Sequence, residues 1–264
     1  MQSLKNNNES NKYIGHIPCL ECASSDALAI YEKDDGSTNG YCYSCRTYFS
    51  HKKLTGVDKQ ELIVEYPHNN IYTLSDVLDK TTILSIPHRD INKDVAERYG
   101  VRVELSEING EIVKTYFPYF VNGQLSGYKV VDRDKKMYSI GFLKGADFFG
   151  QHLCGTGGKM LVITEGEYDT LAAFQMFKER GKNYRVCSLP NGASASSVKK
   201  NIEWVESFEN VILCLDQDDI GKETANEIAG VLRPGKAKIM HFYEKDANDM
   251  LKQGKSLEIG RAHV

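Results

Sequence analysis

Four cysteines in the N-terminal part of the chain have the spacing of a metal site. They form two pairs, Cys19-x-x-Cys22 and Cys42-x-x-Cys45. Two thiolates separated by two residues in a tight turn face one tetrahedral ion, and two such turns complete a four-sulfur zinc site. Because residues 13–50 carry too little apolar mass for a core, the bound ion would supply a folding free energy on the order of 10 kcal/mol. The alternative interpretation is two redox-active or incidental cysteine pairs.

Acidic residues follow three apolar segments in the C-terminal part of the chain. The three clusters are Glu165-Gly166-Glu167-x-Asp169, Asp216-x-Asp218-Asp219 and Asp246-Ala247-Asn248-Asp249. Carboxylates packed together repel one another unless a cation lies between them, and Mg²⁺ or Mn²⁺ is the hard cation that oxygen ligands suit. For any one cluster alone, capping of a following helix is the simpler interpretation. Three clusters after three strands of one sheet favour a metal site instead.

The segments around these acids alternate between strand and helix patterns. Apolar runs predict four strands, and amphipathic patterns predict four helices. The strands are 160–163, 185–189, 211–215 and 237–243, and the helices are 168–178, 194–208, 222–232 and 247–252. This alternation is typical of βαβ units with a mostly parallel sheet. Since ligands bind beyond the carboxyl ends of such strands, the three acidic clusters are expected to meet at that edge.

The middle of the chain predicts one helix and one β-hairpin. The helix is expected over 93–99, between a capping asparagine and a terminating glycine. Two runs of alternating apolar and polar residues, 112–121 and 125–131, flank Asn122-Gly123. Asn-Gly between two such runs is a strong hairpin signal, because both positions of the turn require a positive φ.

The second strand of this hairpin and the segment after it are basic. Residues 128–145 contain five basic and two acidic side chains, a local charge of +3 in a chain whose formal net charge is −3. The basic ones are Lys129, Arg133, Lys135, Lys136 and Lys144. Such a face would hold the phosphates of a nucleotide or a template strand without sequence preference. For any single lysine, protection of a hairpin edge is an equally good explanation.

Composition and charge exclude several classes of protein. The 264 residues are 41% hydrophobic and 26% charged, which is a globular composition. A pI near 6.2 excludes a globally basic nucleic-acid binder but leaves room for a local basic face. No apolar run approaches the roughly 20 residues of a membrane span, and the N-terminus lacks the apolar core of a signal peptide. We therefore expect a cytoplasmic protein without membrane contact, in which the seven cysteines are reduced thiols or metal ligands.

Taken in order along the chain, these motifs resemble those of a known family. The acidic clusters are similar to those of TOPRIM domains, and His16-Ile17-Pro18-Cys19 with the two cysteine pairs resembles the zinc module of bacteriophage DNA primases. The resemblance covers residues 13–253. It implies an enzyme that synthesises RNA primers from NTPs on a single-stranded DNA template, with one structural Zn²⁺ and catalytic Mg²⁺ or Mn²⁺. It further implies a replicative helicase, fused or in a missing continuation, and a DNA polymerase that receives the primer.

The same resemblance implies roles for individual residues. Glu165 would be the general base, and Asp216 and Asp218 would be catalytic metal ligands. The remaining members of the implied Mg²⁺ site are Glu167, Asp169 and Asp246. Lys129 and Lys135 match family lysines that contact nucleotide or template, and Arg133 and Lys136 lie beside them in the same basic segment.

The sequence departs from the family pattern at two positions, one in the zinc module and one in the hairpin, which bear on the template sequence and on nucleotide contacts. Asn39 stands where some members have a histidine implicated in reading a trinucleotide, and Val131 stands where a basic residue can occur. Beside the second cysteine pair lie aromatic and basic side chains that would either stack on unpaired bases or pack on the ribbon itself. These are Tyr41, Tyr43, Arg46 and Tyr48.

We therefore expect an α/β fold (α+β overall), with a small N-terminal zinc ribbon and a two-part polymerase domain that contains a TOPRIM Rossmann-like parallel sheet. The expected divisions are a disordered tail 1–12, a zinc-ribbon template-recognition domain 13–50, a linker 51–66, an N-terminal polymerase part 67–158, a TOPRIM domain 159–253 and a tail 254–264, of which 258–264 matches a translated sequencing adapter. Two alternatives are a TOPRIM nuclease or topoisomerase, although a topoisomerase needs a further tyrosine-bearing domain, and a non-catalytic zinc-ribbon DNA-binding protein.

Overall fold

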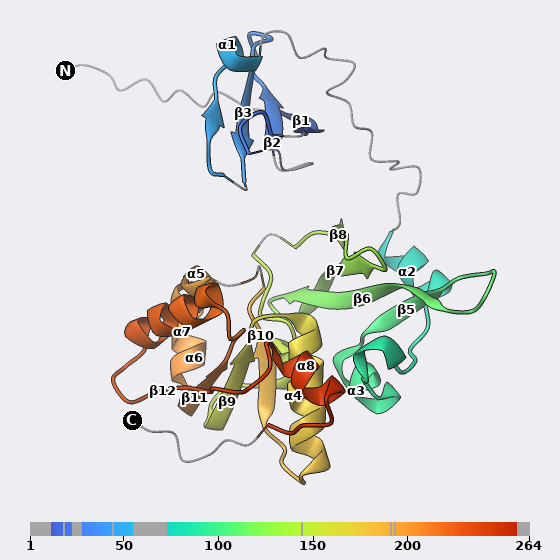
Figure 1. Ribbon diagram of the computed structural model, residues 1–264, viewed down its shortest axis with the longest axis vertical. Coiled ribbons are helices and arrows are strands. Elements are labelled where there is room, and N and C mark those ends of the chain that lie inside the picture. Colours follow the sequence, from blue (N-terminus) through green and yellow to red (C-terminus); the bar gives the residue numbers. More distant parts are fainter. Residues whose placement is uncertain are drawn as a thin grey trace. The chain divides into compact units, whose positions relative to one another are not determined.

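The computed structural model divides into two compact units, residues 1–71 and 72–264 (Figure 1). It describes residues 12–17, 19–22, 28–43, 45–54, 73–143, 145–190, 192 and 194–257. Several predicted segments lie outside the described residues: the expected tail up to residue 11, the linker from residue 55 and the C-terminal segment 258–264. Two residues named in the sequence motifs, Pro18 and Lys144, also lie outside them. No helix in the described ranges has the length and hydropathy of a membrane span.

The first unit is a small antiparallel sheet with a short helix. Its strands pair in the order β1 (Lys12–Ile17), β2 (Leu28–Glu32), β3 (Thr38–Cys42) and β4 (Tyr48–Phe49), and helix α1 (His51–Leu54) follows. Apart from cysteines, the buried apolar side chains among its described residues are few: Ile17, Leu28, Ala29, Ile30, Phe49 and Leu54. A core this small matches the expectation that the unit depends on a bound metal.

The second unit begins with two helices and an antiparallel sheet. Helices α2 (Leu74–Lys80) and α3 (Lys93–Tyr99) flank the 3₁₀ turn η1 (Pro87–Arg89). The sheet has the order β5 (Arg102–Leu105), β6 (Ile112–Val121), β7 (Gln124–Asp132) and β8 (Met137–Gly141). The predicted helix 93–99 and the predicted hairpin are therefore confirmed.

The turn of this hairpin has the geometry that its sequence predicts. Asn122 and Gly123 join β6 to β7 with φ values of 51° and 77°. Two positive φ angles in a two-residue turn match the right-handed twist of the flanking strands, and glycine adopts the second of them at no steric cost. The long hairpin carries the basic side chains toward the C-terminal half of the unit.

A parallel sheet forms the second half of this unit. Its order is β10 (Arg185–Ser188), β9 (Gly158–Thr164), β11 (Phe208–Cys214) and β12 (Ala237–Ile239), and every neighbouring pair is parallel. Its strands read as short apolar runs because both faces are covered. The predicted fold class, an α/β protein with a parallel sheet and a ribbon-like N-terminal unit, is confirmed.

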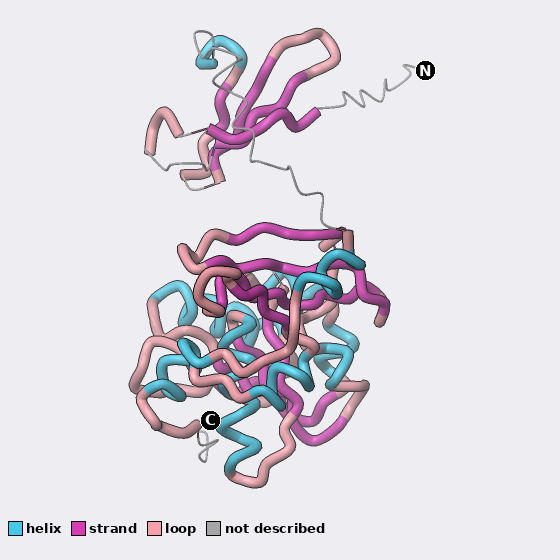
Figure 2. Tube along the Cα trace, turned by 90° about the vertical axis from the view of Figure 1, so that its right-hand side faces the viewer, coloured by secondary structure: helices cyan, strands magenta, loops and turns pink. Residues whose placement is uncertain are grey.

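Helices cover the two faces of the parallel sheet (Figures 1 and 2). On one face, α4 (Glu167–Glu179) and α8 (Ala247–Lys252) pack on Val162, and the same buried cluster continues into Phe117 and Tyr119 of β6. On the other face, α5 (Ala195–Lys200), α6 (Ile202–Glu206) and α7 (Asp219–Val231) pack on Leu161 and Ile163. The alternation between neighbouring residues of β9 is the two-residue period of a strand. A second 3₁₀ turn, η2 (Gln151–Leu153), precedes β9.

Two predicted elements are shorter than expected. The helix predicted over 194–208 is broken at Asn201, whose side chain donates to the carbonyl of Ser197 at 2.9 Å, and Phe208 already belongs to β11. Asparagine side chains compete with helical hydrogen bonds in this way. The strand predicted over 237–243 ends at Ile239, after which the chain turns so that the Lys245 carbonyl accepts from the Gln217 backbone N–H at 2.7 Å. This contact joins the loops that carry two of the acidic clusters.

We predict that Gly221→Ala destabilises the second unit. A Cβ at this buried position would lie 2.2 Å from the Asp216 carbonyl oxygen, so either helix α7 or Asp216 must shift. Overpacking of this kind costs about 1–3 kcal/mol, which thermal unfolding measures directly. Gly230→Ala in the same helix is the control, because its Cβ meets nothing within 4 Å and it should gain about 0.5–1 kcal/mol. Equal effects of the two substitutions would show that α7 is not packed on Asp216.

Candidate metal centres and active site

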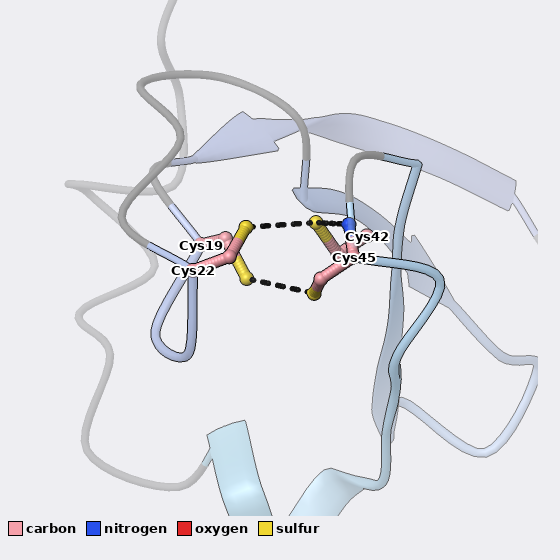
Figure 3. Close-up of side chains that lie close together, drawn as sticks. All are labelled: Cys19, Cys22, Cys42 and Cys45. Atoms are coloured by element: carbon pink, nitrogen blue, oxygen red, sulfur yellow. Dashed lines mark hydrogen bonds between the residues drawn. The ribbon is translucent and has the colours of Figure 1, made fainter. Parts of the chain in front are cut away.

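The four predicted zinc ligands converge in the first unit (Figure 3). Their sulfur atoms all lie within 4.8 Å of one another. Cys19 and Cys45 are 3.7 Å apart between sulfurs, and so are Cys22 and Cys42. A tetrahedral ion with Zn–S bonds near 2.3 Å separates its sulfurs by about 3.8 Å, which matches the two 3.7 Å pairs. The predicted convergence is therefore confirmed.

The cysteines reach this arrangement through two tight turns. One turn follows β1, and the other leads from the end of β3 into β4. In the first turn the Glu21 backbone N–H donates to the Cys19 sulfur at 3.4 Å, and in the second the Cys45 N–H donates to Cys42 at 3.5 Å. Amide donors aimed at sulfur favour the thiolate, which is the form that binds a metal.

Two of the tyrosines beside this centre present their rings to solvent. Tyr43 and Tyr48 are 60% and 58% exposed. The Tyr43 hydroxyl lies 2.9 Å from that of Tyr31, which fixes its direction. Asn39, by contrast, is buried, so its side chain is a poor candidate for reading a base. His51 has a structural contact, since its Nδ1 accepts from the Thr38 backbone N–H at 3.1 Å.

In the second unit, acidic side chains follow the parallel strands and form a rim that we call the acidic rim: Glu165, Asp169, Asp216, Asp218 and Asp246. The influence of neighbouring carboxylates shows in the pKa values of two of them, Glu165 and Asp169. Burial, and then the charge of Asp216, raises the pKa of Glu165, while burial, followed by the charge of Asp246, raises that of Asp169 well above the usual aspartate range. The clusters that the sequence separates by tens of residues are thus electrostatic neighbours.

One buried carboxylate oxygen of the acidic rim has no partner among the described residues. Glu165 Oε2 is buried and has no hydrogen-bond donor in the described part of the chain. Asp216 faces Lys245, whose Nζ lies 3.3 Å from Oδ2, and burial nevertheless raises the pKa of Asp216. Among the described residues, no three carboxylate oxygens lie within 4.8 Å of one another. The donor set suits Mg²⁺ or Mn²⁺, and side chains must draw closer to bind it.

Two acids of the rim also cap helices. Asp218 Oδ1 accepts from the Gly221 N–H at 2.9 Å at the start of α7, and Asp246 Oδ1 accepts from the Asp249 N–H at 2.7 Å at the start of α8. The capping interpretation therefore holds for both. Each cap uses only one carboxylate oxygen, so capping fixes the direction of the side chain and leaves the other oxygen for a cation.

One arginine that the sequence did not suggest is tied to the acidic rim. Arg89 of η1 donates to the side-chain oxygen of Asn248 at 3.2 Å, and the Asn248 amide donates back to the Arg89 carbonyl at 2.8 Å. The backbone N–H of Asn248 donates to Asp169 at 3.0 Å, and the Arg89 guanidinium lies 4.2 Å from the ring centroid of Tyr168. Arg89 and Asn248 are 159 residues apart, so no local pattern connects them.

A cavity of about 940 Å³ lies beside the rim, between the antiparallel sheet and α8. Its volume is in the range of small-molecule sites, about 300–1,000 Å³. Charged and aromatic groups line it, among them Arg89, Arg133, Lys135, Tyr168, Asp246 and Lys252. Two of the predicted nucleotide or template contacts, Arg133 and Lys135, thus face the same space as a member of the rim. Lys136 is exposed and does not line this cavity.

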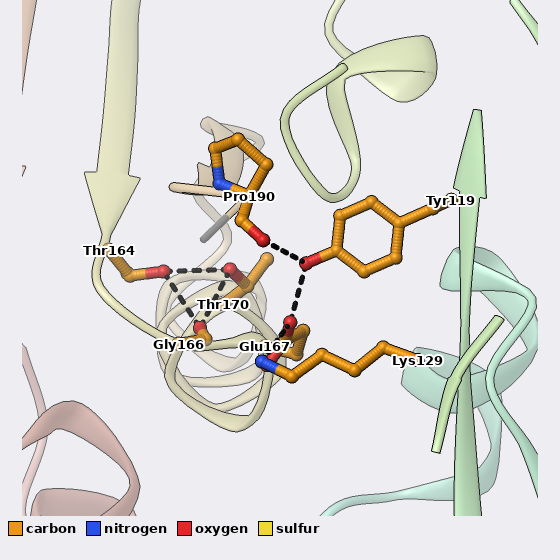
Figure 4. A network of polar contacts seen from close by, with 7 residues as sticks. All are labelled: Tyr119, Lys129, Thr164, Gly166, Glu167, Thr170 and Pro190. Carbon is orange, nitrogen blue, oxygen red and sulfur yellow. Dashed lines mark hydrogen bonds and ion pairs between the residues drawn. The ribbon is translucent and has the colours of Figure 1, made fainter. Parts of the chain in front are cut away.

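Two further predicted site residues contact each other. Glu167 and Lys129 form an ion pair in which Nζ lies 2.9 and 3.0 Å from the two carboxylate oxygens, and the hydroxyl of Tyr119 also donates to Glu167 (Figure 4). The resemblance implied separate roles for them, one as a metal ligand and one as a nucleotide contact. Tyr119 carried no signal in the sequence beyond its place in an apolar strand.

Comparison with known proteins connects both units to phage replication proteins. Residues 162–251 match the Toprim-like family. Over 249 residues, 90% of the chain, the sequence is 30% identical to the DNA helicase/primase of Enterobacteria phage T3. The structure resembles the crystal structure of the primase fragment of the bacteriophage T7 primase-helicase protein, with a TM-score of 0.61 and 29% identity over 92% of this chain and 95% of that chain.

The chain also matches a second T7 structure, with a TM-score of 0.61 and 30% identity over 69% of this chain and 92% of that chain. That structure contains the lagging-strand DNA polymerase interacting with primase domains bound to an RNA/DNA hybrid and dTTP. The chain belongs to the family of bacteriophage DNA primases with a Toprim domain. It spans 41% of the length of the T3 protein.

We predict that Cys42→Ser releases the metal of the first unit. Serine leaves three thiolates and lowers the affinity, so the zinc content by atomic emission should fall from about one ion per chain to well below half. Cys187→Ser is the control, because that thiol is buried in β10 of the second unit and is not one of the four clustered cysteines. Unchanged zinc content in Cys42→Ser would remove this cysteine from the metal site.

We predict that Asp169→Asn stabilises the metal-free protein at neutral pH. Because folding raises the pKa of this carboxyl, the native state is most stable when the group is protonated, and stability is lost as pH rises through the folded-state pKa. Asparagine keeps the acceptor for the Asn248 N–H and removes the charge. In the presence of a chelator, Tm should rise by about 3 °C or more near pH 7 and depend less on pH.

The opposite sign is expected for Asp94→Asn, which is the control. The Lys178 ammonium lowers the pKa of Asp94, so neutralising this side chain removes a favourable interaction at neutral pH. A fall in Tm for Asp169→Asn at neutral pH would mean that its charge is already compensated in the metal-free protein.

Proposed function

We propose that the chain is a DNA primase that makes short RNA primers on single-stranded DNA by metal-dependent nucleotidyl transfer. The observation that carries the proposal is that the acidic rim and the basic cavity lie side by side in one unit, with Asp246 shared between them. Nucleotidyl transfer needs both: anionic ligands for divalent cations and cationic groups for the triphosphate.

The acidic rim would hold Mg²⁺ or Mn²⁺ through Glu165, Asp216 and Asp218, with Asp169 and Asp246 beside them. Bound divalent cations would neutralise charge on the reacting phosphates. Glu165 would accept the proton of the attacking 3′-hydroxyl, since its buried oxygen is free and burial raises the pKa of its carboxyl toward the working range of a general base. The new ester forms at the α-phosphorus, and pyrophosphate leaves.

The cavity would hold the incoming nucleotide. The Arg89 guanidinium is fixed by Asn248 and by the Tyr168 ring, so its planar group is preorganised for a phosphate. Lys135 adds a flexible positive charge, whereas Arg133 is already paired with Glu111. We therefore assign the triphosphate mainly to Arg89 and Lys135.

The first unit would select the template sequence. Exposed tyrosines at the zinc centre, Tyr43 and Tyr48, offer faces on which unpaired bases stack, and such contacts are worth about 1–3 kcal/mol each. One Zn²⁺ would serve only to fold this unit. This assignment follows the proposed division into a zinc-ribbon domain 13–50, a linker 51–66, an N-terminal polymerase part 67–158 and a TOPRIM domain 159–253.

The proposed partners are a replicative helicase, fused or separate, and a DNA polymerase that extends the primer in the cytoplasm of a bacterial host. Support comes from the T3 relative, named a DNA helicase/primase, and from the T7 structure in which a polymerase interacts with primase domains. The second candidate function, a TOPRIM-type nuclease, is favoured by the acidic rim alone and not by the basic cavity.

We predict that the chain, supplied with NTPs, Mg²⁺ and single-stranded DNA covering all trinucleotides, makes short labelled RNA. Asp216→Asn should reduce synthesis by about a hundredfold or more, because it removes a charge from the metal ligands. It should not lower Tm, because burial raises the pKa of Asp216 and its charge therefore does not stabilise the fold. Asp219→Asn, at an exposed neighbouring position, is the control and should keep activity. Shortened DNA in place of RNA would indicate the nuclease, and binding without either product would overturn an enzymatic function.

A further inference from the structure

A partly buried ion pair joins the antiparallel sheet to the Toprim half of the second unit (Figure 4). Glu167 is the first residue of α4, directly after the loop that carries Glu165, and its side chain is 7% exposed. Lys129 reaches it from β7. Among the side chains of the acidic clusters, Glu167 is the one whose two oxygens both receive hydrogen bonds from an ammonium group.

Tyr119 completes the contact from the neighbouring strand. Its hydroxyl donates to Glu167 Oε1 and also lies 3.4 Å from the Pro190 carbonyl, and its ring is buried against Phe149. The ring therefore has no freedom to withdraw the hydroxyl. With Lys129 and Tyr119 as donors, the carboxylate of Glu167 is saturated on the side that faces the hairpin.

This environment does not suit a metal ligand. A divalent cation coordinates oxygen at about 2.1 Å and would stand beside the Lys129 ammonium, where like charges repel. The rim itself offers better ligands: Glu165 has an oxygen without a donor, and the partner of Asp216 is Lys245, a mostly exposed lysine that is free to swing into solvent. The negative charge of Glu167 is already neutralised by the Lys129 ammonium.

We propose that Glu167 and Tyr119 are positioning residues that hold the Lys129 ammonium for a phosphate of the bound nucleotide or primer, and that Glu167 is not a metal ligand. The substrate part of this proposal rests on the proposed primase function. An ammonium has three N–H donors, and the carboxylate takes two of them at 2.9 and 3.0 Å, so one remains for a phosphate oxygen. Fixing a flexible lysine beforehand lowers the entropic cost of binding.

Metal binding without substrate gives the first test. Mn²⁺ affinity of the full chain, measured by electron paramagnetic resonance of the free ion, should stay within about twofold of wild type in Glu167→Gln and Tyr119→Phe, and should fall about tenfold or more in Asp216→Asn. A loss of Mn²⁺ affinity in Glu167→Gln comparable to that in Asp216→Asn overturns the proposal.

The reactivity of Lys129 gives a second test that needs no activity. Acetylation of lysines by a water-soluble ester, followed by mass spectrometry, should label Lys129 faster in Glu167→Gln and in Tyr119→Phe than in wild type. Lys136, an exposed lysine of the same hairpin, is the internal control and should label equally in all three. Unchanged labelling of Lys129 in both variants contradicts a positioning role. If Glu167→Gln does not fold, the labelling rate of Lys129 in Tyr119→Phe, which loses a single hydroxyl, is compared with that in wild type instead.

Steady-state kinetics then connects the pair to substrate. Glu167→Gln should raise the KM for NTP by about tenfold, as expected for a weakened charge-assisted contact, with a smaller change in kcat. Once Lys129→Ala is made, adding Glu167→Gln should cost little more, because both act through one ammonium. Full additivity contradicts the proposal. Absence of RNA synthesis by wild type would refute the primase function, while the Mn²⁺ and labelling results would still decide the role of Glu167.

Discussion

Repulsion between carboxylates at the end of the parallel sheet is the constraint on which the second unit is built. Burial raises the pKa values of Glu165, Asp169 and Asp216, and the charges of neighbouring carboxylates raise them further. A folded chain tolerates this only if a cation is close. In the structure that cation is the Lys245 ammonium beside Asp216, and the unpartnered oxygen of Glu165 marks where more positive charge would be stabilising. Strain of this kind is typical of a site that binds metal in its working state.

The neighbouring helices and loops hold the side chains of the acidic rim in position. Helix caps fix the directions of Asp218 and Asp246, and the close packing of Gly221 on the Asp216 carbonyl fixes the loop between β11 and α7. The antiparallel sheet lies beside the rim and contributes cations of two kinds. Arg133 and Lys135 are exposed at the cavity, whereas Lys129 is half-buried and paired with Glu167. The packing of the two sheets therefore brings the basic side chains of the antiparallel sheet beside the carboxylates of the acidic rim, as the proposed nucleotidyl transfer requires.

Local patterns predicted most of this architecture. The hairpin follows from Asn122-Gly123, and the four-cysteine site follows from cysteine spacing, because in both cases a few adjacent residues determine the geometry. The acidic clusters were also predictable, since parallel strands must end at one edge. The lengths of helices and strands were less predictable. The side chain of Asn201 breaks one predicted helix, and β12 ends where the chain turns toward Gln217.

Contacts between segments that are distant in the chain could not be predicted from the sequence. Arg89 and Asn248 pair across 159 residues, and the Lys129–Glu167 pair joins residues 38 apart, one in β7 and the other at the start of α4. Each of these side chains has an ordinary local environment in the sequence, and its partner is determined only when the two sheets pack on α4. This explains why Arg89 was missed and why Glu167 was grouped with the acids that precede and follow it in the chain.

The most direct measurement of the central claim is the position of the metal itself. Crystals of the chain grown with Mn²⁺ and measured at the manganese absorption edge locate the ion from its anomalous signal, independently of any assay. The account predicts a peak between Glu165 and Asp216, with Lys245 displaced and the Lys129–Glu167 pair intact. A peak on Glu167, or no peak at the rim when the ion is in excess, would contradict it.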